Sequence, residues 1–255
     1  MAGVDNNQLF SAVLAIADDH LVLAHRLSEW CGHAPMLEED LALPNIALDL
    51  LGQARVLYTY AGELEGKGRD EDQLAYLRLE KEYKNLLLVE RENGDFAHTV
   101  LRLFLFASFM ELYWQEMVTS KDATLAAVAA KALKETRYHV RHSAEWVIRL
   151  GDGTDESAER MADAVEELTP YCAEMFDAGV GVYPAVSEGI LVDPSKLAEP
   201  WQAVVSRVFK EAMLQDVSML DGHQRGGRKG EHSEAMGFLL ADLQYMQRVY
   251  PDMVW

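Results

Sequence analysis

The feature that most constrains the fold is a helical periodicity that runs through most of this 255-residue chain. Between Asn7 and Trp30, apolar residues recur every three or four positions, as they do on the buried stripe of an amphipathic helix. The chain has no alternating Val, Ile and Thr runs of the kind that form strands, and its 7 Pro and 17 Gly residues gather between the periodic segments. The sequence therefore predicts an all-α protein.

Four of the predicted helices are long enough to form a bundle, since roughly 20 to 29 residues at about 1.5 Å each span about 30 to 40 Å. They cover residues 7–30, 41–64, 95–118 and 122–150, with Asp95 and Asp122 as N-caps of the last two and Pro44 near the first turn of the second. Two helical hairpins joined by a longer connection are typical of a ferritin-like four-helix bundle, which is the fold we predict.

The remaining segments predict shorter elements around this bundle. A helix at 71–83 and an apolar loop at 85–94 lie in the long connection. Additional C-terminal helices are expected at 156–176, 194–214 and 231–249. No low-complexity linker divides the chain, so we predict a single domain over residues 1–255, with a core bundle at about 7–150 and accessory helices at about 155–250.

The chain is strongly acidic, with 42 Asp and Glu residues against 23 Lys and Arg and a formal charge of −19. This balance excludes a general nucleic-acid binder, because a protein that neutralises phosphates needs a net basic face. A hydrophobic fraction of 49% supplies enough apolar material for a sizeable core.

Cysteine usage and hydropathy indicate the compartment. Cys31 and Cys172 are the two cysteines, too few for a disulfide framework or a Cys-based metal site, which favours a reducing compartment. Residues 1–8 lack the basic and apolar regions of a secretory signal. The most apolar stretch, 101–117, is interrupted by charged residues such as Arg102. We therefore expect a cytoplasmic protein with no membrane span.

A ferritin-like bundle raises the question of iron ligands. Di-iron bundles take a Glu from each of two helices and a Glu-x-x-His pair from each of the other two. None of the 8 histidines here has a Glu three residues before it. Asp95 precedes His98 by three, but it stands at a helix start, where an N-cap explains it better. Since no Gly-x-Ser-x-Gly motif or activated cysteine occurs either, we predict no metal site and no catalytic residue.

Several polar residues nevertheless fall on helix faces that should be interior. Glu29 lies late in the first helix, Gln53 in the second and His139 in the fourth. One interpretation is a remnant or alternative metal site. The interpretation we favour is a network in which these three side chains satisfy one another together with a nearby arginine, either Arg55 or Arg137.

A basic cluster at residues 225–230 is unusual in so acidic a chain. Its cations are Arg225, Arg228 and Lys229, and glycines separate them. Because glycines let backbone amides approach an anion and a helix is expected to follow, an anion-binding loop is one interpretation. The cluster does not match the P-loop pattern. The interpretation that we favour is a docking loop that pairs with acids of this chain or of a partner.

Apolar side chains surround most of the circumference of the helix predicted at 95–118. They include Phe104, Phe106, Phe109, Met110, Tyr113, Trp114 and Met117. A helix that is apolar nearly all round is buried on all sides, which predicts a further layer of structure or a partner subunit.

Several blocks of this sequence, taken in their order and spacing, carry a resemblance to a known family. They are residues 27–35, 45–55, 85–90, 94–99, 134–139, 226–234 and 243–248. Over essentially its whole length, the chain resembles the structural C subunits of bacterial phenylacetyl-CoA epoxidase complexes.

The resemblance implies a non-catalytic subunit of a multicomponent monooxygenase of phenylacetate degradation, inactive alone. Its implied partner is a ferritin-like di-iron catalytic subunit, which epoxidises the aromatic ring of phenylacetyl-CoA with O2. No cofactor is implied in this chain, because flavin, an iron–sulfur cluster and NADPH belong to a reductase partner. A further small subunit, and a CoA ester near the interface, are also implied.

The ligand positions of the catalytic paralogue can be carried over residue by residue. The resemblance places them at Glu29 on the first helix, Leu50 and Gln53 on the second, and Thr136 and His139 on the fourth. Leu50 cannot coordinate a metal, and Thr136 is not a usual iron ligand. We therefore expect five vestigial ligand positions.

Two alternatives remain open beside the structural role. One is an independent ferritin-like, metal-dependent oxidoreductase with a non-standard site at Glu29 and His139. The other, which can coexist with the structural role, is a module in which Arg225, Arg228 and Lys229 hold the phosphates of a CoA ester.

Overall fold

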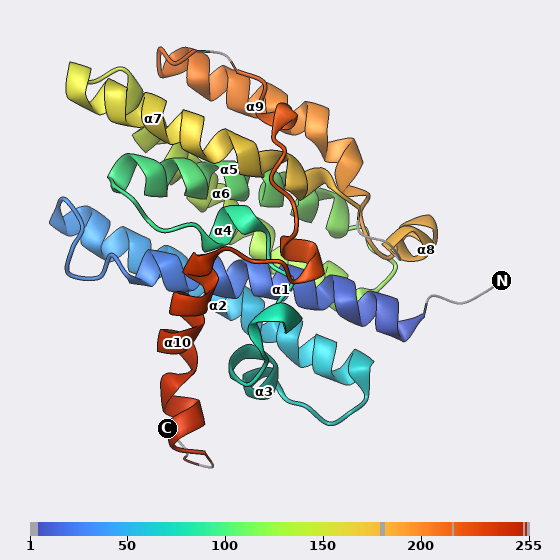
Figure 1. The fold of residues 1–255 in the computed structure, drawn as a ribbon. Helices are drawn as coiled ribbons and strands as arrows, with labels where there is room; N and C mark the ends of the chain where they lie inside the picture. Colours follow the sequence, from blue (N-terminus) through green and yellow to red (C-terminus); the bar gives the residue numbers. More distant parts are fainter. Residues whose placement is uncertain (1–4, 179–181, 216, 252, 254–255) are drawn as a thin grey trace. The chain divides into compact units, whose positions relative to one another are not determined.

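Helices form nearly all the regular structure of the computed structural model, which describes residues 5–178, 182–215, 217–251 and 253 (Figure 1). These residues contain ten α-helices and five short 3-10 segments, and no β-strand. The predicted all-α class is therefore confirmed. Two compact units make up the chain. Unit 1 takes its described residues from Met1–Glu92 and Gly226–Trp255, and unit 2 from Asn93–Arg225. The single domain over 1–255 stays a prediction.

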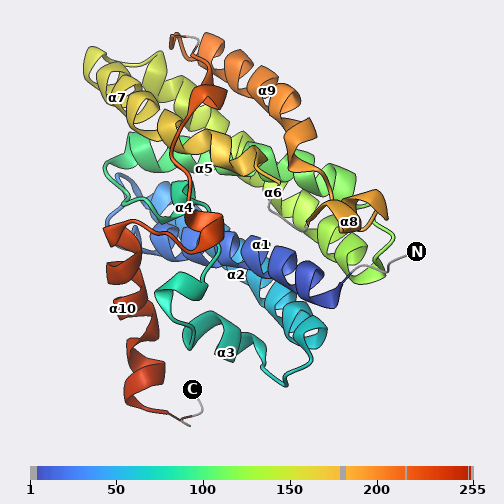
Figure 2. The ribbon, with the colours of Figure 1, turned by 45° about the vertical axis from the view of Figure 1, so that its right-hand side comes forward.

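Unit 1 is built on a long helical hairpin of α1 (Asn6–Ser28) and α2 (Leu37–Glu65), which lie side by side in both views (Figures 1 and 2). The apolar stripe predicted for α1 is buried, and Val13 and Leu27 have no exposed surface. α2 begins earlier than predicted, so Pro44 stands inside the helix rather than near its first turn. Three acids occupy that first turn, where the helix dipole favours negative charge.

The connection that follows α2 differs from its prediction. The helix expected at 71–83 is split into α3 (Glu71–Tyr76) and the 3-10 segment η1 (Glu80–Glu82). The chain bends because Arg78 turns inward: its Nε donates to the Leu74 carbonyl at 2.5 Å, and its Nη1 to the Glu82 carbonyl at 2.8 Å. The loop expected at 85–94 contains one helical turn, α4 (Leu87–Glu90), which is buried.

The C-terminal part of unit 1 contains the 3-10 segment η5 (Gly227–Lys229) and α10 (Glu234–Val249). α10 packs against α3 and η1 and extends away from α1 and α2 in both views (Figures 1 and 2). It begins at Glu234 rather than at the predicted 231, because the amide of Ser233 and the ring of His232 bind Glu90 instead of joining the helix.

Unit 2 begins with α5 (Phe96–Met117) and α6 (Ala123–Gly151). The predicted N-caps are confirmed: Asp95 Oδ1 accepts from the His98 amide at 3.0 Å, and Asp122 Oδ1 from the Leu125 amide at 2.9 Å. α5 packs against α6, α7 (Asp155–Cys172) and α9 (Ala198–Glu211) (Figure 2). The shorter elements of unit 2 are η2 (Ala173–Phe176), α8 (Val182–Ser187), η3 (Pro194–Leu197) and η4 (Met219–Asp221).

The aromatic helix α5 is buried on all sides, as predicted. Phe104 and Trp114 have no exposed surface. The indole Nε1 of Trp201 on α9 donates to the Leu105 carbonyl at 3.0 Å, which ties the outer helix to the backbone of α5. Unit 2 thus supplies a further layer over α5 from its own helices.

α5 is also, by length and composition alone, the one helix in the described part of the chain that is apolar enough to cross a membrane. The charged interruptions in its sequence therefore do not rule out a span by themselves. In its most apolar 18-residue window, 78% of the residues are buried inside the protein, which is typical of the core helix of a soluble protein.

Candidate functional site

The five positions carried over from the family are divided between the units. In unit 1, Glu29 is the C-cap of α1, and α2 buries Leu50 and Gln53, which are 3% and 4% exposed. In unit 2, α6 buries Thr136 and His139, which are 2% and 1% exposed. The spacing of three places each helix pair on one buried face.

The donor atoms at these positions do not fit a di-iron centre. Glu29 is the only carboxylate of the set, and its Oε1 accepts a hydrogen bond from Arg26 Nη1 at 2.8 Å, with the side chain 39% exposed. Leu50 carries no donor atom, and His139 supplies a single imidazole. Across the described ranges, no group of three or more His, Cys, Asp or Glu side chains is placed to hold a metal ion.

The arginines predicted for an inner network do not lie inside the protein. Arg55 is paired with Glu71 at 3.2 Å and has a side chain 76% exposed. Arg137 faces Glu111 at 3.6 Å and is 58% exposed. The prediction is wrong on this point, because both long side chains keep their charged ends in solvent.

A largely buried group of charged side chains lies elsewhere in unit 1. We call them the charge cluster, which consists of Asp18, Asp19, Arg26, Arg78, Glu90, Arg228 and His232. The cluster joins α1 to residues 78–90 and to the C-terminal segment that begins at Gly226. Of its members, Arg228 alone is a candidate site residue from the sequence.

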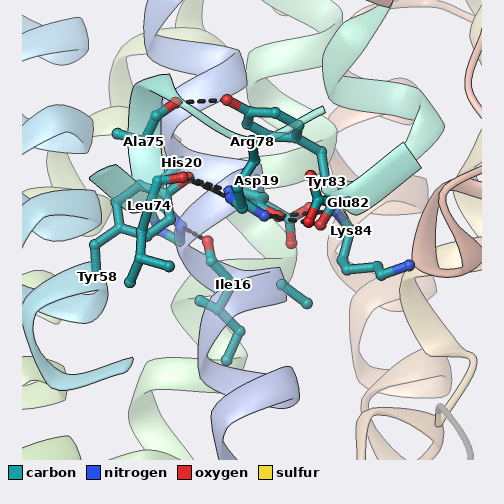
Figure 3. A network of polar contacts seen from close by, with 12 residues as sticks. Ile16, Asp19, His20, Tyr58, Leu74, Ala75, Arg78, Glu82, Tyr83 and Lys84 are labelled. Atoms are coloured by element: carbon teal, nitrogen blue, oxygen red, sulfur yellow. Dashed lines mark hydrogen bonds and ion pairs between the residues drawn. The ribbon is translucent and has the colours of Figure 1, made fainter. Parts of the chain in front are cut away.

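Asp18 and Arg78 form an ion pair that is almost completely buried. Tyr58 and Tyr83 lie beside Arg78 (Figure 3). Arg78 Nη1 donates to Asp18 Oδ2 at 3.1 Å, and Nη2 also contacts this carboxylate. The Tyr58 hydroxyl donates to Asp18 Oδ1 at 2.6 Å, and the Lys84 amide to Oδ2 at 2.7 Å. Each carboxylate oxygen therefore has donors, which a buried charge requires.

The tyrosines help to hold the Arg78 guanidinium. Its carbon lies 4.0 Å from the centroid of the Tyr83 ring, a cation–π contact, and Figure 3 shows Tyr58, Arg78 and Tyr83 converging. Burial raises the pKa of Tyr83 to about 12 and that of Tyr58 well above its ordinary value. Both phenols therefore keep their protons at neutral pH.

Asp19 makes the second ion pair of the cluster, with Arg228. Arg228 Nη1 and Nη2 donate to Asp19 Oδ1 and Oδ2 at 3.0 and 2.7 Å, and Nη1 also reaches the carbonyls of Ala15 and Lys84. The Leu86 amide adds a bond to Oδ1 at 2.7 Å. Burial raises the pKa of Asp19 to about 6, although the charge of Arg228 acts to lower it.

Glu90 and His232 complete the cluster, and both side chains are fully buried. His232 Nδ1 lies 2.7 Å from Glu90 Oε2, and its Nε2 lies 3.1 Å from the Tyr83 carbonyl. Burial acts to lower the pKa of His232, but the hydrogen bond and charge of Glu90 outweigh it, so the pKa is raised. Both ring nitrogens face acceptors, which suits the protonated imidazolium.

The glycines of the basic cluster serve close packing within unit 1. A Cβ on Gly227 would lie 2.1 Å from the Asn85 carbonyl oxygen, and one on Gly230, whose φ is +80°, would lie 2.1 Å from that of Lys81. Side chains at these positions would block the contact between the cluster and residues 81–87.

Two of the three cations of the basic cluster have acidic partners within their own units. Arg228 binds Asp19 in unit 1, and Arg225 binds Asp177 in unit 2 at 2.6 Å. Lys229 is exposed. The docking-loop interpretation expects pairing with acids of this chain or of a partner. Both arginines pair with acids of this chain. Binding of CoA phosphates by the three residues stays a prediction.

A cavity of about 460 Å³ in unit 2 has the wrong charge for such phosphates. It lies between α7 and residues 214–215 and 217–223, with apolar walls that include Val165 and Leu214. The carboxylates that line it are Asp163, Glu166 and Asp221. An anionic ligand would meet like charge there.

Comparison with known proteins decides the family. Residues 1–255 match the family model described as "Phenylacetic acid catabolic protein". The chain belongs to this family. It is 48% identical over 249 residues to the C subunit of 1,2-phenylacetyl-CoA epoxidase of Escherichia coli (strain K12), a match that covers 98% of this chain and 100% of the relative. The resemblance and the ferritin-like helical fold predicted from the sequence are confirmed.

In this member of the phenylacetic acid catabolic protein family, the charge cluster has a structural role. Its charges are neutralised within unit 1, and they connect α1, the 78–90 segment and the C-terminal segment. One signal for it was available in the sequence: Asp18 and Asp19 interrupt the buried stripe of the first helix directly after Ala17. Nothing in the sequence indicated which cations would neutralise them.

Proposed function

We propose that this chain is the non-catalytic structural subunit of a multicomponent di-iron monooxygenase. The enzyme would epoxidise the aromatic ring of phenylacetyl-CoA in phenylacetate degradation. The observation that carries the proposal is similarity from end to end to a protein named as the C subunit of 1,2-phenylacetyl-CoA epoxidase, at 48% identity over 98% of this chain.

The residues at the family's ligand positions support a non-catalytic role. Leu50 and Thr136, which the resemblance aligns with glutamates of the catalytic paralogue, are buried. The single carboxylate of the set, Glu29, is engaged with Arg26. We therefore assign the di-iron centre to a ferritin-like catalytic partner. We assign the flavin, the iron–sulfur cluster and NADPH to a reductase partner.

The contribution of this chain is then shape and rigidity. Its buried charges form ion pairs with one another. Burial raises the pKa of the Cys172 thiol, so this cysteine is not an activated nucleophile. By binding the catalytic subunit, the chain would stabilise and complete it in the cytoplasm. The complex would also contain a small subunit, with the CoA ester near an interface.

Metal analysis and reconstitution test the proposal. The catalytic subunit, this chain and the co-expressed pair are purified separately, and their iron content and turnover of phenylacetyl-CoA with reductase and NADPH are measured. We expect iron in the catalytic subunit and turnover by the pair. Stoichiometric iron in this chain, or full turnover without it, would contradict the proposal.

Two substitutions separate this role from that of an independent oxidoreductase. A catalytic site at Glu29 and His139 requires that Glu29→Ala and His139→Ala abolish turnover while folding and assembly persist. A structural subunit that has folded and assembled with either substitution should still support turnover.

A further inference from the structure

The solvent-facing side of α10 carries large apolar side chains, although the opposite side already packs on unit 1. The packed side consists of Ala235, Met236, Leu239, Leu240 and Gln244, which are buried. On the outer side, Phe238, Tyr245 and Val249 are 64%, 58% and 47% exposed. Their spacing of seven and four places them along one stripe of the helix. Asp242, four residues after Phe238 and three before Tyr245, is exposed on the same stripe. Single exposed apolar residues are ordinary, but several large ones along one stripe mark an interaction surface.

Two further apolar side chains are exposed on the bend between α3 and η1. Leu77 and Leu79 are 50% and 54% exposed, and they flank Arg78 in the chain. The Arg78 carbonyl accepts hydrogen bonds from two α10 side chains, Gln244 Nε2 at 2.9 Å and Arg248 Nη2 at 3.2 Å. The two leucines therefore lie beside α10.

We call this surface the α10 patch and define it as Phe238, Tyr245, Val249, Leu77 and Leu79. Large aromatic and aliphatic side chains of this kind form the centres of protein–protein interfaces.

The charges around the α10 patch are mainly acidic. Glu234 and Asp242 are exposed on α10, and Glu80 Oε2 lies 3.4 Å from the position of a Cβ on Gly237. Arg248 is a cation on this side, and it is engaged with the Arg78 carbonyl. A partner with an apolar centre and a rim of lysine and arginine would complement this arrangement. A second copy of this chain, with a charge of −19, would instead bring acids against acids.

The α10 patch is held in place before any partner arrives. At the start of the helix, the Ser233 amide donates to Glu90 Oε1 at 2.6 Å, and Arg26 Nη2 donates to the Ala235 carbonyl at 3.1 Å. In its middle, Gln244 Nε2 also donates to the Tyr83 hydroxyl at 2.9 Å. Association therefore does not require α10 to become ordered first, which lowers the entropic cost of binding.

We infer that the α10 patch is the surface on which this subunit binds a partner protein whose apolar contact face is bordered by lysine and arginine. The inference rests on the proposed function, which names that partner as the catalytic subunit. It adds the binding surface and the chemistry of the partner's face.

Binding between the purified full-length chain and the catalytic subunit, followed by titration calorimetry, tests the inference. Tyr245→Asp should weaken the affinity at least tenfold, and Phe238→Asp combined with Tyr245→Asp should weaken it further. Tyr183→Asp on α8 is the matched control, because Tyr183 is 56% exposed in unit 2, and it should bind like the wild type. Circular dichroism checks that each variant is folded.

The acidic rim is tested by reversing its charge. Glu80→Lys with Asp242→Lys should weaken binding, and the affinity of this variant should fall less with added salt than that of the wild type.

Three outcomes would contradict the inference. If the wild type binds the catalytic subunit and the variant with both Phe238→Asp and Tyr245→Asp binds it with the same affinity, the inference is overturned and the proposed function stays intact. A wild type to which the catalytic subunit does not bind contradicts the proposed function and the inference with it. A dimer of this chain that the double variant dissociates overturns the inference in favour of a second copy.

Discussion

Arg228 binds Asp19 through both terminal guanidinium nitrogens, at 3.0 and 2.7 Å, although 209 positions separate the two residues in the chain. The chain leaves unit 1 after Glu92 and returns at Gly226. This ion pair therefore fastens the returning segment to α1, with the Asp19 side chain 1% exposed and that of Arg228 25% exposed.

Replacing Arg228 should destabilise unit 1 because it leaves a buried carboxylate without its cation. We expect Arg228→Met to lower the free energy of unfolding by about 3 kcal/mol at pH 8, measured by urea denaturation. Arg225→Met is the matched control, since Arg225 and Asp177 are 35% and 52% exposed. Loss of that surface pair should cost less than about 1 kcal/mol.

The effect of Arg228→Met should also depend on pH. Arg228 acts to lower the pKa of Asp19, so its removal raises that pKa further above the native value of about 6. Since the folded state binds this proton more tightly than the unfolded state, stability falls as pH rises from the ordinary pKa of 3.8 through the folded pKa. The deficit of the variant should therefore shrink towards pH 5, where Asp19 is neutral. A deficit that is the same at pH 5 and pH 8 would contradict this account.

Local signals in the sequence were enough to predict the long helices of the fold. The periodicity of α1 and the caps at Asp95 and Asp122 depend on residues within a turn of one another, and the structure confirms them. The helix predicted at 71–83 was wrong because Arg78 turns inward to Asp18, 60 positions away. The apolar periodicity of the segment depends only on nearby residues, so it cannot predict a partner so far away in the sequence.

The candidate site was less predictable for the same reason. Arg228 was noticeable as a cation in an acidic chain, but its partner Asp19 lies in another part of the sequence. Leu50 and Thr136 could be assigned only through the family resemblance, because a buried leucine or threonine on a helix is ordinary in any core.

The Glu90–His232 pair should make stability depend on pH. The pKa of His232 is raised from 6.5, so the stabilisation by its proton is fully present below pH 6.5 and is lost as pH rises through the folded pKa. The melting temperature of His232→Gln should therefore differ from that of the wild type more at pH 6 than at pH 9. His33→Gln, at an exposed histidine, is the control for the loss of an imidazole side chain. A gap for His232→Gln that widens with rising pH would be inconsistent with a raised pKa.

Gly227 should tolerate no side chain because the backbone of residue 85 already occupies the space. Gly227→Ala would place Cβ 2.1 Å from the Asn85 carbonyl oxygen, and we expect a loss of about 3 kcal/mol in urea denaturation. Gly52→Ala is the control: it lies inside α2 with nothing within 4 Å of the new Cβ, and it should stabilise the helix by about 0.5 to 1 kcal/mol. Equal effects of the two substitutions would show that the basic cluster is not packed against residues 81–87.

Leu50 should behave as a core residue, although the family resemblance predicts it at a ligand position of the catalytic paralogue. It is 3% exposed, so Leu50→Ala removes buried methyl groups and leaves a cavity. We expect a loss of about 3 kcal/mol in the free energy of unfolding. Leu48→Ala is the matched control on the same helix, because Leu48 is 64% exposed and its truncation should change stability by less than about 0.5 kcal/mol. If Leu50→Ala were as mild as Leu48→Ala, position 50 would not be a packing position of the core. A large difference would mean that this chain uses the position for packing, which is what the proposed structural role expects.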